Sequence, residues 1–104
     1  MKRIGYKMKL KTGCKEEYKK RHDNIWPELL EELSLFGLSD FQIFWDKETD
    51  ILFASYLQEK EANKKTQPGG DVQRKWWDYM KDLMDVNQDN SPVTTPLEEV
   101  FYME

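Results

Sequence analysis

Several residue types that carry familiar chemistry are almost absent from this 104-residue chain. The one cysteine, Cys14, cannot form a disulfide within the chain, and a small chain without disulfides is typical of a reducing compartment. One histidine and one cysteine, with no carboxylates at a matching spacing, make no recognisable metal-ligand set. The pair Gly69-Gly70 belongs to no phosphate-binding loop. We therefore expect neither a metal nor a nucleotide cofactor.

An excess of positive charge and a long apolar run are also missing. The formal net charge is −4, and Lys and Arg are interspersed with Asp and Glu along the chain. Nucleic-acid binding and polybasic membrane attachment both require a basic surface, so both are disfavoured. Residues 1–11 are interrupted by charge throughout, which excludes a signal-peptide core, and no stretch approaches transmembrane length. We expect a cytoplasmic protein.

Aromatic residues, in contrast, are abundant. The chain has four Trp, five Tyr and five Phe, a content that disordered chains lack. These side chains must mostly be packed or line a pocket. The length suits one small core, so we expect a single domain over residues 1–104.

The hydropathy pattern predicts strands and helices in a recognisable order. Apolar residues alternate, or strand formers gather, in four segments: residues 4–10, 41–45, 51–57 and 97–103. Helical spacing predicts one helix from about Cys14 to Phe36 and another over 72–84, capped by Asp71. The polar residues 59–67 are expected to form a short helix or loop. Pro27 interrupts the first helix, either as part of a new first turn after Asp23 or Asn24, or as a kink.

This order predicts an α+β fold. Strand, helix, strand, strand, helix, strand is the split βαβ arrangement, a ferredoxin-like four-stranded antiparallel sheet with the helices on one face. Two strands carry apolar residues on both sides, as the neighbours Phe44-Trp45 and Leu52-Phe53 show. The sheet face without helices then needs a cover, and a second copy of the chain is the simplest source. We expect a homodimer.

The only histidine, His22, is the first candidate for chemistry. It follows Tyr18 by one helical turn, so the imidazole and the phenol lie on one face. That face continues through the apolar residues of the same predicted helix and therefore points inward. Imidazole is the side chain that titrates near neutral pH, and a phenol beside it can orient the ring or bind a substrate hydroxyl. His22 and Tyr18 are therefore candidates for proton transfer and substrate binding.

The adjacent pair Trp76-Trp77 is the second candidate. Neighbouring residues on a helix point about 100° apart, so both side chains rarely enter the same core. One can pack against the sheet while the other borders a pocket, where a flat indole suits the C–H surface of a sugar. Two packing tryptophans would give the same pattern.

Three strings together resemble the L-rhamnose mutarotase family, and the resemblance covers essentially the whole chain. They are Glu17-Tyr18-x-x-Arg21-His22-x-x-Ile25-Trp26-Pro27-Glu28-Leu29, Trp76-Trp77-x-Tyr79-Met80, and Asn87-x-Asp89-Asn90-Ser91-Pro92 leading to Glu99-Val100-Phe101-Tyr102. The resemblance implies a dimeric α+β barrel in the cytoplasm that interconverts the α and β anomers of L-rhamnose without a cofactor.

The resemblance also assigns residues to roles. It implies His22 as proton donor, with Tyr18, Trp76 and Trp77 as sugar contacts. Where the family typically has a sugar-contacting tyrosine at the start of the second strand, this chain has Phe41, which keeps the ring and lacks the hydroxyl. An aromatic pocket also suits the methyl group of a 6-deoxy sugar.

Anomerisation needs an acid for the ring oxygen and a base for the anomeric hydroxyl, and an imidazole near its pKa can exchange protons at neutral pH. The sequence does not identify the base: Tyr18, Asp23, Asp89 or a held water could serve. Two other functions remain open at this point. They are a cofactor-independent monooxygenase on the same fold and a module that binds a small ligand without catalysis.

Overall fold

The computed structural model describes residues 1–59 and 70–104. A short helix or loop is predicted at residues 59–67, and all of these residues except 59 lie outside the described ranges. No described helix is long and apolar enough to cross a membrane.

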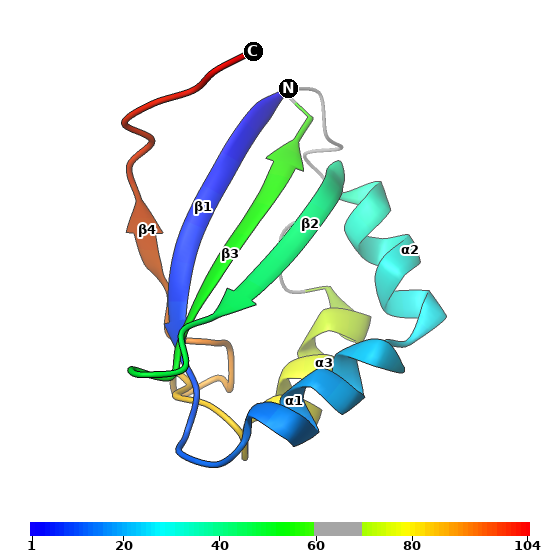
Figure 1. Ribbon diagram of the computed structural model, residues 1–104. Helices are drawn as coiled ribbons and strands as arrows, with labels where there is room; N and C mark the ends of the chain where they lie inside the picture. The colour runs from blue at the N-terminus through cyan, green and yellow to red at the C-terminus, as the bar shows by residue number, and fades with distance from the viewer. Residues whose placement is uncertain (60–69) are drawn as a thin grey trace.

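Four antiparallel strands form one sheet in the order β2-β3-β1-β4 (Figure 1). The strands are β1 (Lys2–Lys9), β2 (Leu38–Trp45), β3 (Ile51–Gln58) and β4 (Thr95–Leu97). The turn at residues 46–50 joins β2 to β3 as a hairpin, in which Trp45 pairs with Leu52. Asp50, with φ at 61°, provides the left-handed residue that the turn requires. The predicted ferredoxin-like sheet is confirmed.

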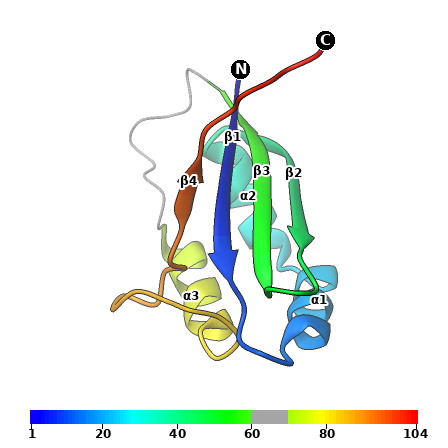
Figure 2. The same ribbon diagram turned by 60° about the vertical axis from the view of Figure 1, so that its left-hand side comes forward.

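The three described helices cover one face of this sheet, and none of them lies on the other face, which is called the bare face below (Figure 2). They are α1 (Lys15–Asp23), α2 (Pro27–Leu35) and α3 (Asp71–Met80). The first predicted helix is thus two helices. Trp26 is extended, with φ −66° and ψ 129°, as a residue before proline prefers, and Pro27 then opens α2 where no backbone N–H is needed. The chain therefore changes direction shortly after His22.

The start and end of α3 differ from the prediction. Gly70, not Asp71, is the N-cap, and the helix ends at Met80. The backbone N–H of Gln73 is capped from α2, where a carboxylate oxygen of Glu32 accepts its hydrogen bond at 2.8 Å. A Cβ at residue 70 would require the Glu32 carboxylate to shift. This contact joins α2 to α3.

The last strand is shorter than predicted and lies earlier in the chain, sharing only Leu97 with the predicted residues 97–103. β4 spans only Thr95–Leu97 and pairs with three residues of β1, from Gly5 to Lys7. Residues 98–104 form no strand, and their chain runs away from the sheet (Figure 1). Strand-forming residues extend a sheet only where a neighbouring strand pairs with them. Within the described chain, residues 100–103 have no such neighbour.

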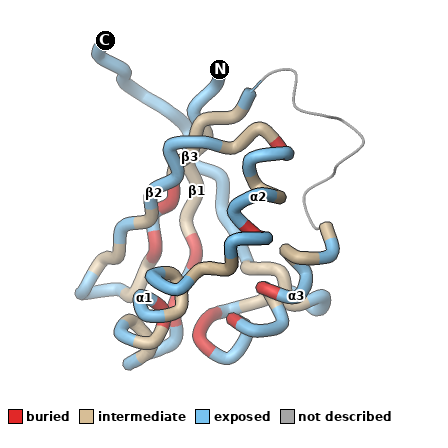
Figure 3. Tube along the Cα trace, turned by 90° about the vertical axis from the view of Figure 1, so that its right-hand side faces the viewer, coloured by how far each residue is buried: buried red, intermediate tan, exposed pale blue. Residues whose placement is uncertain are grey.

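The core fills the layer between the helices and the sheet (Figure 3). Its buried residues come from strands, helices and the segment after α3: Met8, Leu10, Tyr18, Leu29, Leu52, Ala54, Trp76, Met80, Leu83 and Met84. On the bare face, Phe44 and Phe53 are cross-strand partners, and both are exposed. Burial therefore separates a packed, helix-covered face from a face on which Phe44 and Phe53 are exposed and which no described helix covers.

Candidate active site

One face of α1 supplies the polar side chains of a cavity. They recur at the spacing of a single helical stripe: Lys15, Tyr18, Lys19, His22 and Asp23. Tyr18 and His22 were predicted to share this face, and the structure confirms that placement. The two lysines were missed, although the same spacing would have found them.

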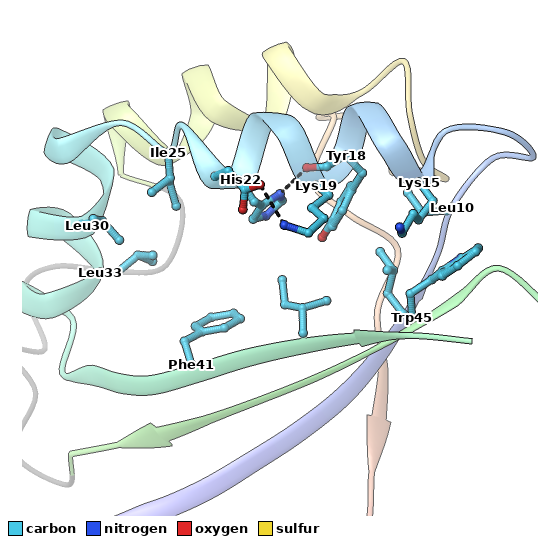
Figure 4. A pocket seen from close by; sticks show the side chains of 13 residues that line it. Leu10, Lys15, Tyr18, Lys19, His22, Ile25, Leu30, Leu33, Phe41 and Trp45 are labelled. Atoms are coloured by element: carbon cyan, nitrogen blue, oxygen red, sulfur yellow. Dashed lines mark hydrogen bonds and ion pairs between the residues drawn. The ribbon is translucent and has the colours of Figure 1, made fainter. Parts of the chain in front are cut away.

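The cavity has a volume of about 490 Å³ and lies between α1, α2 and β2 (Figure 4). This volume is in the range of small-ligand pockets. Apart from the α1 stripe, its walls are apolar: Leu10, Ile25, Leu30, Leu33, Phe41, Ile43, Trp45 and Leu52. A carbon-rich wall opposite a polar rim suits a ligand with one apolar and one hydroxylated side.

Hydrogen bonding fixes the tautomer of His22. Its Nδ1 lies 3.0 Å from the backbone carbonyl oxygen of Tyr18, one turn earlier in α1. A carbonyl oxygen only accepts, so Nδ1 carries the proton and donates it. In the neutral ring, Nε2 then holds a free lone pair. No described residue pairs with Nε2, which leaves this nitrogen available to a ligand.

Burial keeps His22 mostly neutral. Desolvation lowers the pKa of the imidazole below its ordinary value of 6.5. The hydrogen bond to the Tyr18 carbonyl and the charge of Asp23 act in the opposite direction, and desolvation is the larger effect. At neutral pH the ring is therefore ready to accept a proton at Nε2.

Tyr18 extends from α1 toward the sheet beside His22 (Figure 4). The two rings are 4.3 Å apart between centroids. Burial, with a smaller contribution from the nearby Tyr6, raises the pKa of the Tyr18 phenol. The phenol therefore stays protonated at neutral pH and can serve as a hydrogen-bonding group, whereas a phenolate base is excluded there.

Trp76, on α3, also contacts His22. Its ring lies edge-on to the imidazole at 5.4 Å, and Trp26 meets Trp76 edge-on at 5.1 Å. Trp76 is 7% exposed and belongs to the core, whereas Trp77 is half-buried at the edge of the core. Neither tryptophan lines the cavity of Figure 4. Their predicted contact with a sugar stays a prediction.

Arg21 ties α1 to α3 next to His22. Its guanidinium donates to both carboxylate oxygens of Asp82, at 2.9 and 3.2 Å, and to the carbonyl of Tyr79 at 2.6 Å. It also lies over the Tyr79 ring at 4.5 Å and pairs with Glu17. A planar fork of donors suits this geometry, which a lysine would not reproduce.

The remaining candidates occupy different places. Phe41 lines the cavity from β2 (Figure 4), and its predicted contact with a sugar stays a prediction. Asp23 lies at the rim and forms an exposed ion pair with Lys19 at 2.8 Å. Asp89 lies outside the cavity, where its carboxylate accepts hydrogen bonds from Ser91 and shapes the loop. Asp89 is therefore not the base of this cavity.

Comparison with known proteins agrees with this geometry. The family model described as L-rhamnose mutarotase matches residues 3–103. The chain belongs to the L-rhamnose mutarotase family.

Relatives in this family match along the full chain. L-rhamnose mutarotases of Bacteroides thetaiotaomicron and Phocaeicola vulgatus are 54% and 52% identical over 104 residues, and each match covers all of both chains. The crystal structure of an L-rhamnose mutarotase from Formosa agariphila superimposes with a TM-score of 0.90 at 50% identity, again over both whole chains. The fold of this chain is thus that of a solved member of its family.

Proposed function

We propose that this chain interconverts the α and β anomers of L-rhamnose, as an isomerase of the racemase and epimerase class. The observation that carries the proposal is the geometry of His22, whose Nδ1 is fixed to the Tyr18 carbonyl while Nε2 remains free. The names of its full-length relatives support the same substrate. Phe41, Tyr18 and the apolar wall supply a surface for the sugar ring and its methyl group.

Ring opening breaks the bond from C1 to the ring oxygen and moves one proton, and ring closure reverses both changes. Nε2 of neutral His22 accepts the proton of the anomeric hydroxyl as the bond from C1 to the ring oxygen breaks and the C1 aldehyde forms. The imidazolium then gives that proton to the ring oxygen. Both oxygens are attached to C1, so one nitrogen can reach both. Rotation about the adjoining C–C bond and the reverse steps close the ring on the other face.

This scheme needs no second base. Tyr18 keeps its proton at neutral pH and can bind a sugar hydroxyl instead. Asp23 is the one carboxylate at the rim, and it forms an exposed ion pair with Lys19. We assign both proton transfers to His22 and no proton transfer to Asp23. This assignment agrees with the donor role that the family resemblance implies for His22.

The test follows the exchange of anomers directly. Saturation-transfer NMR on L-rhamnose, or optical rotation after dissolving the crystalline α anomer, should show acceleration over buffer. His22→Ala should reduce the acceleration by at least about tenfold, since general acid–base catalysis contributes roughly 10²–10⁴-fold. Sugar binding without acceleration by the wild-type protein would favour a binding module. Oxygen uptake with a quinol would favour a monooxygenase.

A homodimer through the bare sheet face is part of this proposal. The exposed cross-strand pair Phe44 and Phe53 forms an apolar surface there. Residues 100–103 add further exposed apolar side chains. Monomeric proteins rarely expose such apolar surfaces, and in a two-fold symmetric dimer each copy covers the surface of the other.

Sedimentation or light scattering measures the mass in solution. The wild-type chain should have twice its monomer mass, and Phe44→Glu should shift it toward a monomer. A monomeric wild-type chain would contradict the dimer. We also propose a cytoplasmic location, because Cys14 has no cysteine to pair with.

A further inference from the structure

Three aromatic rings lie side by side on the helix-covered face of the sheet, one from each of β2, β3 and β1. Phe41 stacks on Tyr56 with centroids 5.3 Å apart and an interplanar angle of 21°. Tyr6 meets Tyr56 edge-on at 6.1 Å. In the register of β1 and β3, Tyr56 pairs with Ile4 and Tyr6 with Ala54, so the two tyrosines are diagonal neighbours on one face.

One ring of this row, Phe41, belongs to the cavity lining, whereas Tyr56 and Tyr6 are its neighbours and do not themselves line the cavity. Phe41 lines the cavity below His22. At the other end, the Tyr6 and Tyr18 phenols are close enough for Tyr6 to raise the pKa of Tyr18, in addition to the effect of burial. Burial likewise raises the pKa of Tyr6 and of Tyr56. All three phenols are therefore neutral hydroxyl groups at neutral pH.

The phenol oxygens of Tyr6, Tyr18 and Tyr56 have no hydrogen-bond partner among residues 1–59 and 70–104. Each of the three oxygens keeps some exposed surface, because every fully buried side-chain oxygen in these ranges has a hydrogen-bond partner. Neutral phenols without a partner among the described residues suit the hydroxyl groups of a sugar, since each can both donate and accept.

We propose that Tyr56 is a specificity-determining residue of this site, whose phenol hydrogen-bonds one sugar hydroxyl beside the ring of Phe41. Phe41 offers the sugar an apolar face and has no hydroxyl of its own, so the polar contact at this end of the cavity comes from the neighbouring ring. Tyr6, edge-on to Tyr56, positions that ring. The assignment rests on the proposed sugar-anomerising function.

The test combines Tyr56→Phe with sugars that each lack one hydroxyl. The variant keeps the ring that stacks on Phe41, so its thermal unfolding should match that of the wild type. With L-rhamnose, KM should rise by about 3- to 10-fold with kcat nearly unchanged, as expected for one neutral hydrogen bond to bound substrate. With the deoxy analogue that lacks the contacted hydroxyl, wild type and variant should have the same KM.

Ser55→Ala is the matched control. Ser55 is the preceding residue on β3, and its hydroxyl accepts a hydrogen bond from Arg3 on the bare face of the sheet. This variant should leave KM unchanged. An unchanged KM in Tyr56→Phe, or an equal rise for every deoxy analogue, would overturn the assignment. Failure of the proposed function looks different, because the wild-type protein itself would then not accelerate anomer exchange.

Discussion

The two sides of the His22 ring differ sharply in their surroundings. On the α3 side, Trp76 packs edge-on against the ring, and Arg21 bonds the two helices together beside it. On the other side lies the cavity, where no described residue pairs with Nε2 of His22. One side therefore holds the imidazole in place, and the other leaves its reactive nitrogen free. Substitutions on the α3 side should lower stability and shift the imidazole, whereas substitutions on the cavity side should change sugar binding and turnover.

The largest effect on folding is expected for Trp76→Ala. Trp76 is 7% exposed and contacts Trp26, Tyr79 and His22, so the variant leaves a cavity in the core. Such truncations cost roughly 3–5 kcal/mol of unfolding free energy, measurable by urea denaturation. Trp77→Ala, at a half-buried position, should cost less. If Trp76→Ala unfolds like the wild type and loses only sugar affinity, Trp76 belongs to the substrate side.

Arg21→Ala should have an intermediate effect. The guanidinium is 13% exposed and bonds the Tyr79 carbonyl of α3 and the Asp82 carboxylate just after that helix. Hydrogen bonds to charged groups contribute roughly 1.5–3 kcal/mol, and the 61% exposure of Asp82 places the expected loss at the lower end of that range. The variant should also change the ring signals of His22, which NMR detects without overlap because the chain has one histidine. Arg21→Lys should not restore them.

Arg3→Ala is the control for Arg21, because it removes another Arg–Asp pair. The Arg3 side chain is 36% exposed, against 13% for Arg21, and exposed pairs contribute about 0–1 kcal/mol. The His22 signals should not move. Equal losses of stability in Arg3→Ala and Arg21→Ala would contradict a special role for the bond between the helices.

Tyr18→Phe should have the smallest effect on folding. The phenol oxygen has no protein partner among the described residues, so the variant should unfold like the wild type. Loss of one hydrogen bond to the sugar should lower kcat/KM by about 3- to 10-fold, as measured by saturation transfer. A large loss of stability would instead show that the hydroxyl supports the fold.

The sequence predicted much of the fold because its strands alternate clearly. Ile43 and Trp45 on β2 face the same side as Leu52 and Ala54 on β3, as the register requires. The last strand was predicted too late in the chain, at residues 97–103 and not at Thr95–Leu97, since the apolar residues 100–103 have strand propensity without a neighbouring strand among the described residues. Propensity indicates a strand only where pairing is available.

The site was predicted in part for a similar reason. One helical turn separates Tyr18 from His22, so their shared face follows from helix geometry alone. The same geometry could not decide which way Trp76 and Trp77 face, because that depends on how α3 is seated by Arg21 and Glu32. The tautomer of His22 also depends on a backbone carbonyl that no sequence pattern displays.

The most direct test of the account compares two pH titrations. NMR of the His22 ring gives its pKa, and saturation transfer with L-rhamnose gives the dependence of kcat/KM on pH. Because the buried ring has a pKa below 6.5 and works from its neutral form, activity should fall as pH drops through that pKa, with matching midpoints. Activity that rises as His22 becomes protonated, or that ignores its titration, would contradict the account.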